Sequence, residues 1–102
     1  MDYRRTYLRD LLQLAPGTPA SAHGWVKTRR DSKGISFVQL SDGSAFKDLQ
    51  VVVPEGAIPE DTLKKITTGA CVRFDGEIVE SPAAGQAVEL SARSVEIYGE
   101  AD

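Results

Sequence analysis

Residues 25–40, WVKTRRDSKGISFVQL, contain two alternating segments separated by the turn sequence DSKG. In the second segment Val38 and Leu40 alternate with Phe37 and Gln39, and this two-residue period is typical of a strand with one buried face. Glycine at the end of the polar DSKG run favours a tight turn between two strands. The stretch therefore predicts a β-hairpin in which Val38 and Leu40 point into a core.

The strand before the turn begins near residue 21 and shows the same period. One alternating set is Ala22, Gly24, Val26 and Thr28, and the other is His23, Trp25, Lys27 and Arg29. If Val26 is buried, strict alternation places Trp25 and Arg29 together on the outer face. Strict alternation also places Arg30 in the opposite phase to Arg29.

Further strands and helices are predicted in the rest of the chain. Residues 49–53, 71–81 and 87–99 alternate in the same way, and the loop PAAGQ separates the last two segments. Residues 59–69, PEDTLKKITTG, have the proline and carboxylates that favour a helix start, and a glycine past its end. Residues 3–17 predict a short amphipathic helix that stops at Pro-Gly.

The order of these elements predicts an all-β domain with short helices. We expect a five-stranded Greek-key barrel of the oligonucleotide/oligosaccharide-binding (OB) type, with a helix between its third and fourth strands. An SH3-like barrel is the alternative, although such barrels usually lack a helix at this point. The expected divisions are an amphipathic helix packing on the barrel (1–17), the barrel (18–99) and the start of a linker (100–102). In the first division Thr6 is the expected N-cap, and the packing stripe is Leu8, Leu11 and Leu12.

Composition excludes several classes of function. The 102 residues, 41% apolar and 26% charged, suit one compact domain. No apolar run approaches the ~20 residues of a membrane span, and the first five residues lack a signal-peptide core, so we expect a cytoplasmic protein without a membrane partner. One cysteine, Cys71, and one histidine, His23, provide neither a disulfide nor a zinc site. We expect Cys71 to be a small buried residue, and no pattern of nucleophile and base indicates catalysis.

Charge is unevenly distributed although the net charge is only −3. Residues 1–33 carry seven cations against three anions, a net +4, and the remaining residues carry five cations against twelve anions, a net −7. A local basic surface on an acidic body can steer a polyanion to one face. Solvated surface charge without a ligand is the alternative.

The alternation also defines a candidate binding face. With the apolar sets inside the barrel, the residues that share its outer face are Phe37, Gln39, Gln50 and Glu89. An aromatic ring beside amides and cations suits single-stranded nucleic acid, because a ring stacks on any base for about 1–3 kcal/mol and guanidinium groups neutralise phosphate. If the second strand were shifted by one residue, Phe37 would instead be a core residue, and Gln50 and Glu89 are commonly plain solvated strand residues.

Several stretches together resemble the N-terminal anticodon-binding domain of asparaginyl-tRNA synthetases, class II enzymes grouped with the aspartyl and lysyl enzymes. They are GWVKTRRDSKGISFVQLSDGS (24–44), LQVVV (49–53), TTGACVRFDGEIVESP (67–82) and GQAVELSARSVEI (85–97). The resemblance covers nearly the whole chain from about residue 18. The stretches TRRDSKGISF, DGS and SPxxGQ are more similar to the asparaginyl branch than to its relatives.

The resemblance implies roles for individual side chains. Phe37 would stack on the middle anticodon base, a uridine, and Gln50 would hydrogen-bond that base. Arg30 would hold the loop near the same nucleotide, and Glu89 would read the Watson–Crick edge of the first base, a guanine or its queuosine derivative. The other expected RNA contacts are Arg29, Lys27, Lys33, Gln39 and Trp25.

The resemblance also implies what this chain lacks. Members of the family carry a large catalytic domain that holds ATP and Mg, and none follows Gly99, so we expect this chain alone to be no enzyme and to hold no cofactor. Its expected partners are the tRNA(Asn) anticodon stem-loop and the class II catalytic domain. Two alternatives remain: an OB domain that binds single strands without sequence preference, and a protein-docking module.

Overall fold

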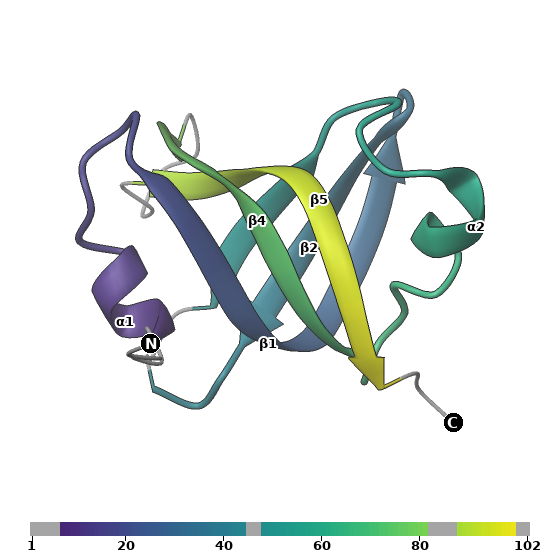
Figure 1. Cartoon of the computed structure of the whole chain (residues 1–102), viewed down its shortest axis with the longest axis horizontal. Coiled ribbons are helices and arrows are strands. Elements are labelled where there is room, and N and C mark those ends of the chain that lie inside the picture. Colours follow the sequence, from purple (N-terminus) through teal and green to yellow (C-terminus); the bar gives the residue numbers. More distant parts are fainter. Residues whose placement is uncertain (1–6, 45–47, 82–87, 100–102) are drawn as a thin grey trace.

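The computed structural model describes residues 7–44, 48–81 and 88–99. Five strands close into a barrel in the order β1-β2-β3-β5-β4, and β4 pairs back onto β1 (Figure 1). The strands are β1 (Pro19–Ser32), β2 (Ile35–Ser41), β3 (Leu49–Val53), β4 (Cys71–Glu80) and β5 (Val88–Gly99). The helices are α1 (Leu8–Leu11) and α2 (Glu60–Leu63). The predicted five-stranded OB-type barrel with a helix between its third and fourth strands is confirmed.

The predicted apolar sets fill the barrel. Val38 and Leu40 of β2 are fully buried, and Leu49, Val51 and Val53 of β3 are at most 2% exposed. The β4 and β5 strands add Phe74, Ile78 and Leu90 to the same core. Burial of this apolar surface is the main force that stabilises such a domain. It also determines which alternate residues of β2 and β3 must face outward.

The DSKG sequence forms a two-residue hairpin connection. Ser32 pairs with Ile35, and the two residues between them, Lys33 and Gly34, have φ angles of 52° and 84°. Two successive positive φ angles are typical of a type I′ turn, whose twist matches that of the flanking strands. Lys33 is therefore held in a left-handed conformation that is costly for a residue with a Cβ.

Both helices are shorter than predicted, for the same reason. Leu12 and Lys64 are the last residues to donate in the i−4 pattern, and those that follow donate in the i−3 pattern, as in Leu14 N–H to Leu11 O and Ile66 N–H to Leu63 O. These tighter turns end the α-helices early. The expected ranges 3–17 and 59–69 thus contain α-helices of four residues each.

A carboxylate from a loop distant in sequence binds the first backbone N–H of α1. The preceding residue Tyr7 makes no side-chain cap hydrogen bond, whereas the Leu8 N–H donates to the Asp42 carboxylate over 2.9 Å. Thr6, the predicted cap, lies outside the described residues. Leu8 and Leu11 are 1% and 2% exposed and belong to the barrel core. The helix is therefore joined to the barrel by both packing and a hydrogen bond.

Two glycines allow β1 and β4 to approach their neighbours closely. A Cβ on Gly24 would collide with the Ser41 carbonyl oxygen, and a Cβ on Gly76 would collide with that of Ser91.

The expectation that Cys71 is buried is wrong, because Val72 occupies the inward phase and Cys71 is exposed. The predicted loop at 82–86 and linker at 100–102 lie outside the described residues. Within the described part of the chain, neither helix has the length or apolar character needed to cross a membrane.

Candidate nucleic-acid interface

A β-bulge in β1 determines which basic residues face outward. Val26 pairs with Leu40 but Thr28 pairs with Gln39, so β1 has one extra residue, Lys27, at this point. Beyond the bulge the phase is reversed, and Arg29 lies opposite the buried Val38. The prediction that Arg29 shares the outer face with Trp25 is therefore wrong.

Arg29 instead binds groups of the protein itself. Its Nη1 donates to the carbonyl oxygens of Leu63 and Ile66, over 2.6 and 3.1 Å, and its Nε and Nη2 form a two-point contact with the Asp31 carboxylate. Hydrogen bonds from Arg29 and Ser36 lower the pKa of Asp31 below its usual value of 3.8. The guanidinium thus ties β1 to the end of α2 and to the turn that follows it.

The first outward row of side chains contains a cation and an aromatic ring. Across the sheet, Arg30 pairs with Phe37, Phe37 with Val52, and Val52 with Ser91. Directly paired residues point to the same face, so these four side chains form a row over β1, β2, β3 and β5. The Arg30 guanidinium lies 4.5 Å from the centroid of the Phe37 ring. The bulge thereby brings Arg30, and not Arg29, to the predicted stacking residue.

The second outward row is polar throughout. Thr28 pairs with Gln39 and Gln39 with Gln50, and Gln50 is followed on β5 by Glu89. Gln39 is exposed and Gln50 is half-buried. This row lies one pleat away from Phe37, about 7 Å along the strand. It can therefore present hydrogen-bonding groups to a base that stacks on the ring.

Glu89 is the most buried member of the second row. It is only 6% exposed, although its phase is outward as predicted. Gln50 Nε2 donates to its Oε2 over 2.6 Å, and the Ser81 hydroxyl donates to the same oxygen over 3.3 Å. A buried carboxylate needs such partners, because desolvation without them is costly. The Gln50–Glu89 hydrogen bond was not predicted from the sequence.

The remaining predicted contacts lie at the margins of the two rows. The Lys27 ammonium lies 3.5 Å from the Asp48 carboxylate, and its side chain is 52% exposed. Trp25 is 42% exposed and its ring passes close to Gly43. Lys33 is at the tip of the β1–β2 hairpin. Three cations, Lys27, Arg30 and Lys33, therefore flank the aromatic and amide groups on one face.

This arrangement is suited to binding and not to reaction chemistry. The face offers a ring for stacking, amides and a carboxylate for base edges, and cations for phosphate. Among residues 7–44, 48–81 and 88–99, no cluster of three histidine, cysteine or acidic side chains could hold a metal ion.

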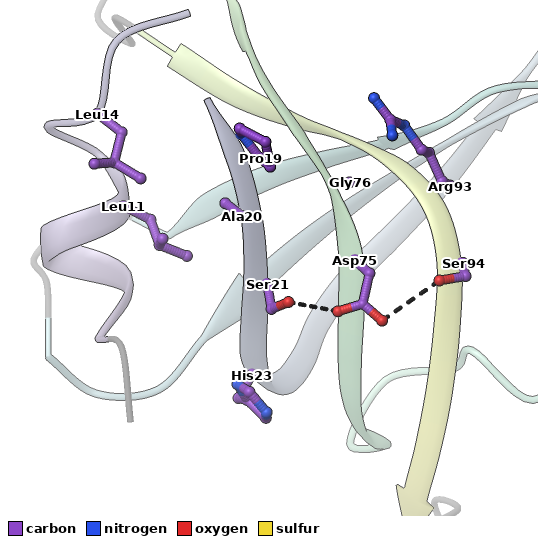
Figure 2. A pocket seen from close by; sticks show the side chains of 10 residues that line it. All are labelled: Leu11, Leu14, Pro19, Ala20, Ser21, His23, Asp75, Gly76, Arg93 and Ser94. Atoms are coloured by element: carbon purple, nitrogen blue, oxygen red, sulfur yellow. Dashed lines mark hydrogen bonds between the residues drawn. The ribbon is translucent and has the colours of Figure 1, made fainter. Parts of the chain in front are cut away.

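A separate groove of about 770 Å³ lies between α1 and the strands β1, β4 and β5 (Figure 2). In it Asp75 accepts hydrogen bonds from Ser21, over 2.5 Å, and from Ser94, over 3.4 Å. Leucines 11 and 14 form its apolar side. The residues that line the groove include none of those predicted to contact RNA and none of β2 or β3. The groove and the outer face of β2 and β3 are therefore distinct surfaces.

Comparison with known proteins agrees with the fold. Residues 20–98 match the tRNA_anti-codon family model, described as an OB-fold nucleic acid binding domain. The chain is 54% identical over 97 residues to an asparagine–tRNA ligase of Solibacter usitatus. The matched region covers 95% of this chain and 21% of that protein. The chain thus spans about a fifth of the length of this relative.

Solved structures show the same fold at low sequence identity. Asparaginyl-tRNA synthetase from Pyrococcus horikoshii, complexed with asparaginyl-adenylate, superposes with a TM-score of 0.82 at 20% identity, over 97% of this chain and 23% of that one. An OBody, AM3L09, bound to hen egg-white lysozyme superposes with a TM-score of 0.80 at 17% identity, over 99% of this chain and all of that one. The family match covers most of the chain, and the fold agrees with it. The chain belongs to the tRNA_anti-codon family of OB-fold nucleic acid binding domains.

Proposed function

We propose that this chain is the anticodon-recognition module of an asparagine–tRNA ligase and binds the anticodon loop of tRNA(Asn) on the face formed by its two outward rows. The single observation that carries the proposal is the first row, in which a half-buried aromatic ring and a cation lie side by side on the outside of the barrel. The 54% identity to an asparagine–tRNA ligase supports the choice of tRNA.

Phe37 is the proposed stacking residue for the middle base of the anticodon. Its position on the outer face gives a base access to the ring, and such stacking contributes about 1–3 kcal/mol. The contact with Arg30 restrains both side chains before RNA binds, so less conformational freedom is lost on binding. Arg30 also supplies a cation for a phosphate beside the stacked nucleotide.

The second row supplies the proposed sequence readers. Gln50 hydrogen-bonds the middle base, a uridine, and Gln39 lies beside it on the same face. Glu89 accepts from the N1–H and N2–H groups of a guanine at the first anticodon position, a pairing that suits a carboxylate. Lys27 and Lys33 attract the RNA backbone from the two ends of the face.

The catalytic activity belongs to the remainder of the proposed ligase. The chain corresponds to about 21% of the related enzyme, and its outward rows offer binding groups only. ATP, Mg and the amino acid would be held by the class II catalytic domain. The proposed partners of this module are therefore tRNA(Asn) and that domain.

The test is a titration of the chain with three anticodon stem-loops: GUU, GUC, and GAU, in which adenosine replaces the middle uridine. We expect GUU and GUC to bind more tightly than GAU, and Phe37→Ala to weaken GUU binding by about tenfold or more. Tyr98→Ala is the matched control, because Tyr98 is an exposed aromatic residue near the far end of β5. Equal binding of all three loops would indicate an OB domain without sequence preference, and no binding at low salt would indicate a docking module.

A further inference from the structure

A short hydrogen bond on the outer face joins the two proposed base readers to each other. Gln50 Nε2 lies 2.6 Å from Glu89 Oε2. A carboxylate can only accept hydrogen bonds, so the amide nitrogen of Gln50, and not its oxygen, must face Glu89. Nitrogen and oxygen occupy the two arms of a planar amide, and Oε1 is consequently turned away from Glu89.

We propose that Glu89 is a positioning residue for Gln50: it orients the amide so that an acceptor, Oε1, meets the middle base of the bound loop. The inference rests on the proposed function, and it assigns Glu89 a second task besides reading the first base. Uridine presents the N3–H donor on its Watson–Crick edge, whereas cytidine has an unprotonated acceptor at N3. An outward Oε1 therefore favours uridine.

Burial and a second donor keep the orienting carboxylate in place. Glu89 is 6% exposed, and the Ser81 hydroxyl donates to the same Oε2 atom. Little water competes for this oxygen, so a reversed Gln50 amide would place its own oxygen against a carboxylate oxygen. Two facing acceptors in a poorly hydrated site are strongly unfavourable. Glu89 thus selects one of the two amide orientations.

The test removes any direct role of Glu89 at the first base. Stem-loops with an abasic first anticodon position and either uridine or cytidine in the middle are titrated into the 102-residue chain. The measured quantity is the ratio of the two dissociation constants, cytidine over uridine. We expect a ratio of about ten in the parent and about one in Gln50→Ala, the effect of one hydrogen bond.

Glu89→Gln is the decisive variant, because glutamine preserves the shape of the side chain. Its amide has both a donor and an acceptor, so it can pair with the Gln50 amide in either orientation. We expect its ratio to fall to about three or less. The matched control is Glu96→Gln, the same change on a part of β5 outside the two rows, where Glu96 pairs with Arg73, and it should keep the parental ratio. An unchanged ratio in Glu89→Gln, together with a lost ratio in Gln50→Ala, would overturn the orienting role alone. An unchanged ratio in Gln50→Ala would overturn the reading role of Gln50 and this proposal with it.

A measurement without RNA provides an independent check. In the parent, the Nε2 proton of Gln50 that faces Glu89 should resonate downfield of its position in a solvated glutamine amide, because it is held by the carboxylate. In folded Glu89→Gln the two protons should move toward the values of a solvated amide. Unchanged Gln50 resonances in that variant would contradict the proposal.

Discussion

Replacing each of two adjacent arginines, Arg29 and Arg30, by methionine is expected to change different properties, the stability of the barrel in one case and RNA binding in the other. Methionine retains an apolar stem of similar length and removes the guanidinium. The Arg29 side chain is only 19% exposed and donates to the backbone carbonyls of Leu63 and Ile66, whereas Arg30 is exposed and contacts the Phe37 ring. Arg29→Met should therefore destabilise the barrel, and Arg30→Met should weaken RNA binding.

The size of the stability loss follows from the contacts of Arg29. Hydrogen bonds from a charged donor contribute about 1.5–3 kcal/mol each, and the two carbonyl bonds are not independent. The contact with Asp31, whose side chain is 58% exposed, adds less than about 1 kcal/mol. We expect a loss of about 3 kcal/mol in the free energy of unfolding, or roughly 15 °C in Tm for a domain of this size. Arg30→Met should lose less than about 1 kcal/mol, the value of an exposed cation–π contact.

The assays are urea unfolding of both variants and titration of the GUU stem-loop at several salt concentrations, below the Tm of each. Loss of one phosphate contact should reduce the slope of log K against log salt by about 0.7 in Arg30→Met and leave it unchanged in folded Arg29→Met. Equal stability losses in the two variants would refute the assignment of their faces. So would a smaller salt slope in Arg29→Met than in Arg30→Met.

Three further predictions concern the turn, a close contact and pH. Lys33→Asn should raise Tm by a few degrees, because asparagine tolerates positive φ better, while it weakens stem-loop binding at low salt; unchanged Tm would contradict the strain argument. Gly76→Ala should cost more than about 2 kcal/mol in urea unfolding, because its Cβ would meet the Ser91 carbonyl, and a near-neutral result would mean that β4 and β5 can separate locally. Asp31 has a lowered pKa in the folded state, so its contribution is present above about pH 4 and is lost as the pH falls through the lower folded value. Stability should therefore fall less between about pH 5 and pH 2 in Asp31→Asn than in the parent, and parallel curves would exclude this linkage.

The barrel could be predicted from the sequence because its apolar residues mark the phase of most strands. Val38 and Leu40 in β2, and the three apolar residues in the inward phase of β3, leave one arrangement that buries them all. That arrangement places Phe37 and Gln50 outside, which the structure also shows. The hydrophobic pattern thus predicted the barrel and the part of the candidate face that lies on β2 and β3.

The part of the candidate face that lies on β1 could not be predicted from any local sequence pattern. Residues 27–32 of β1 are all polar, so no apolar residue after Val26 indicates which of them point inward. The bulge at Lys27 therefore could not be predicted from the alternation of apolar and polar residues. Arg29 is held by carbonyl groups at and just after the end of α2, more than 30 residues away, and Arg30 lies against a ring on the neighbouring strand β2. The cap of α1 is likewise distant in sequence, since the Leu8 N–H donates to Asp42, 34 residues away.

The bulge at Lys27 also determines where this barrel can change length. The β1 strand can lose its surplus residue, Lys27, and still pair Val26 with Leu40 and Thr28 with Gln39, because the deletion only removes the bulge. The β2 strand has no such reserve, since its five rungs with β3 run without irregularity from Ser36 to Leu40. A deletion there would turn a buried side chain out to solvent. One-residue deletions among homologous chains should therefore accumulate at the bulge position, residue 27, and be excluded from the centre of β2.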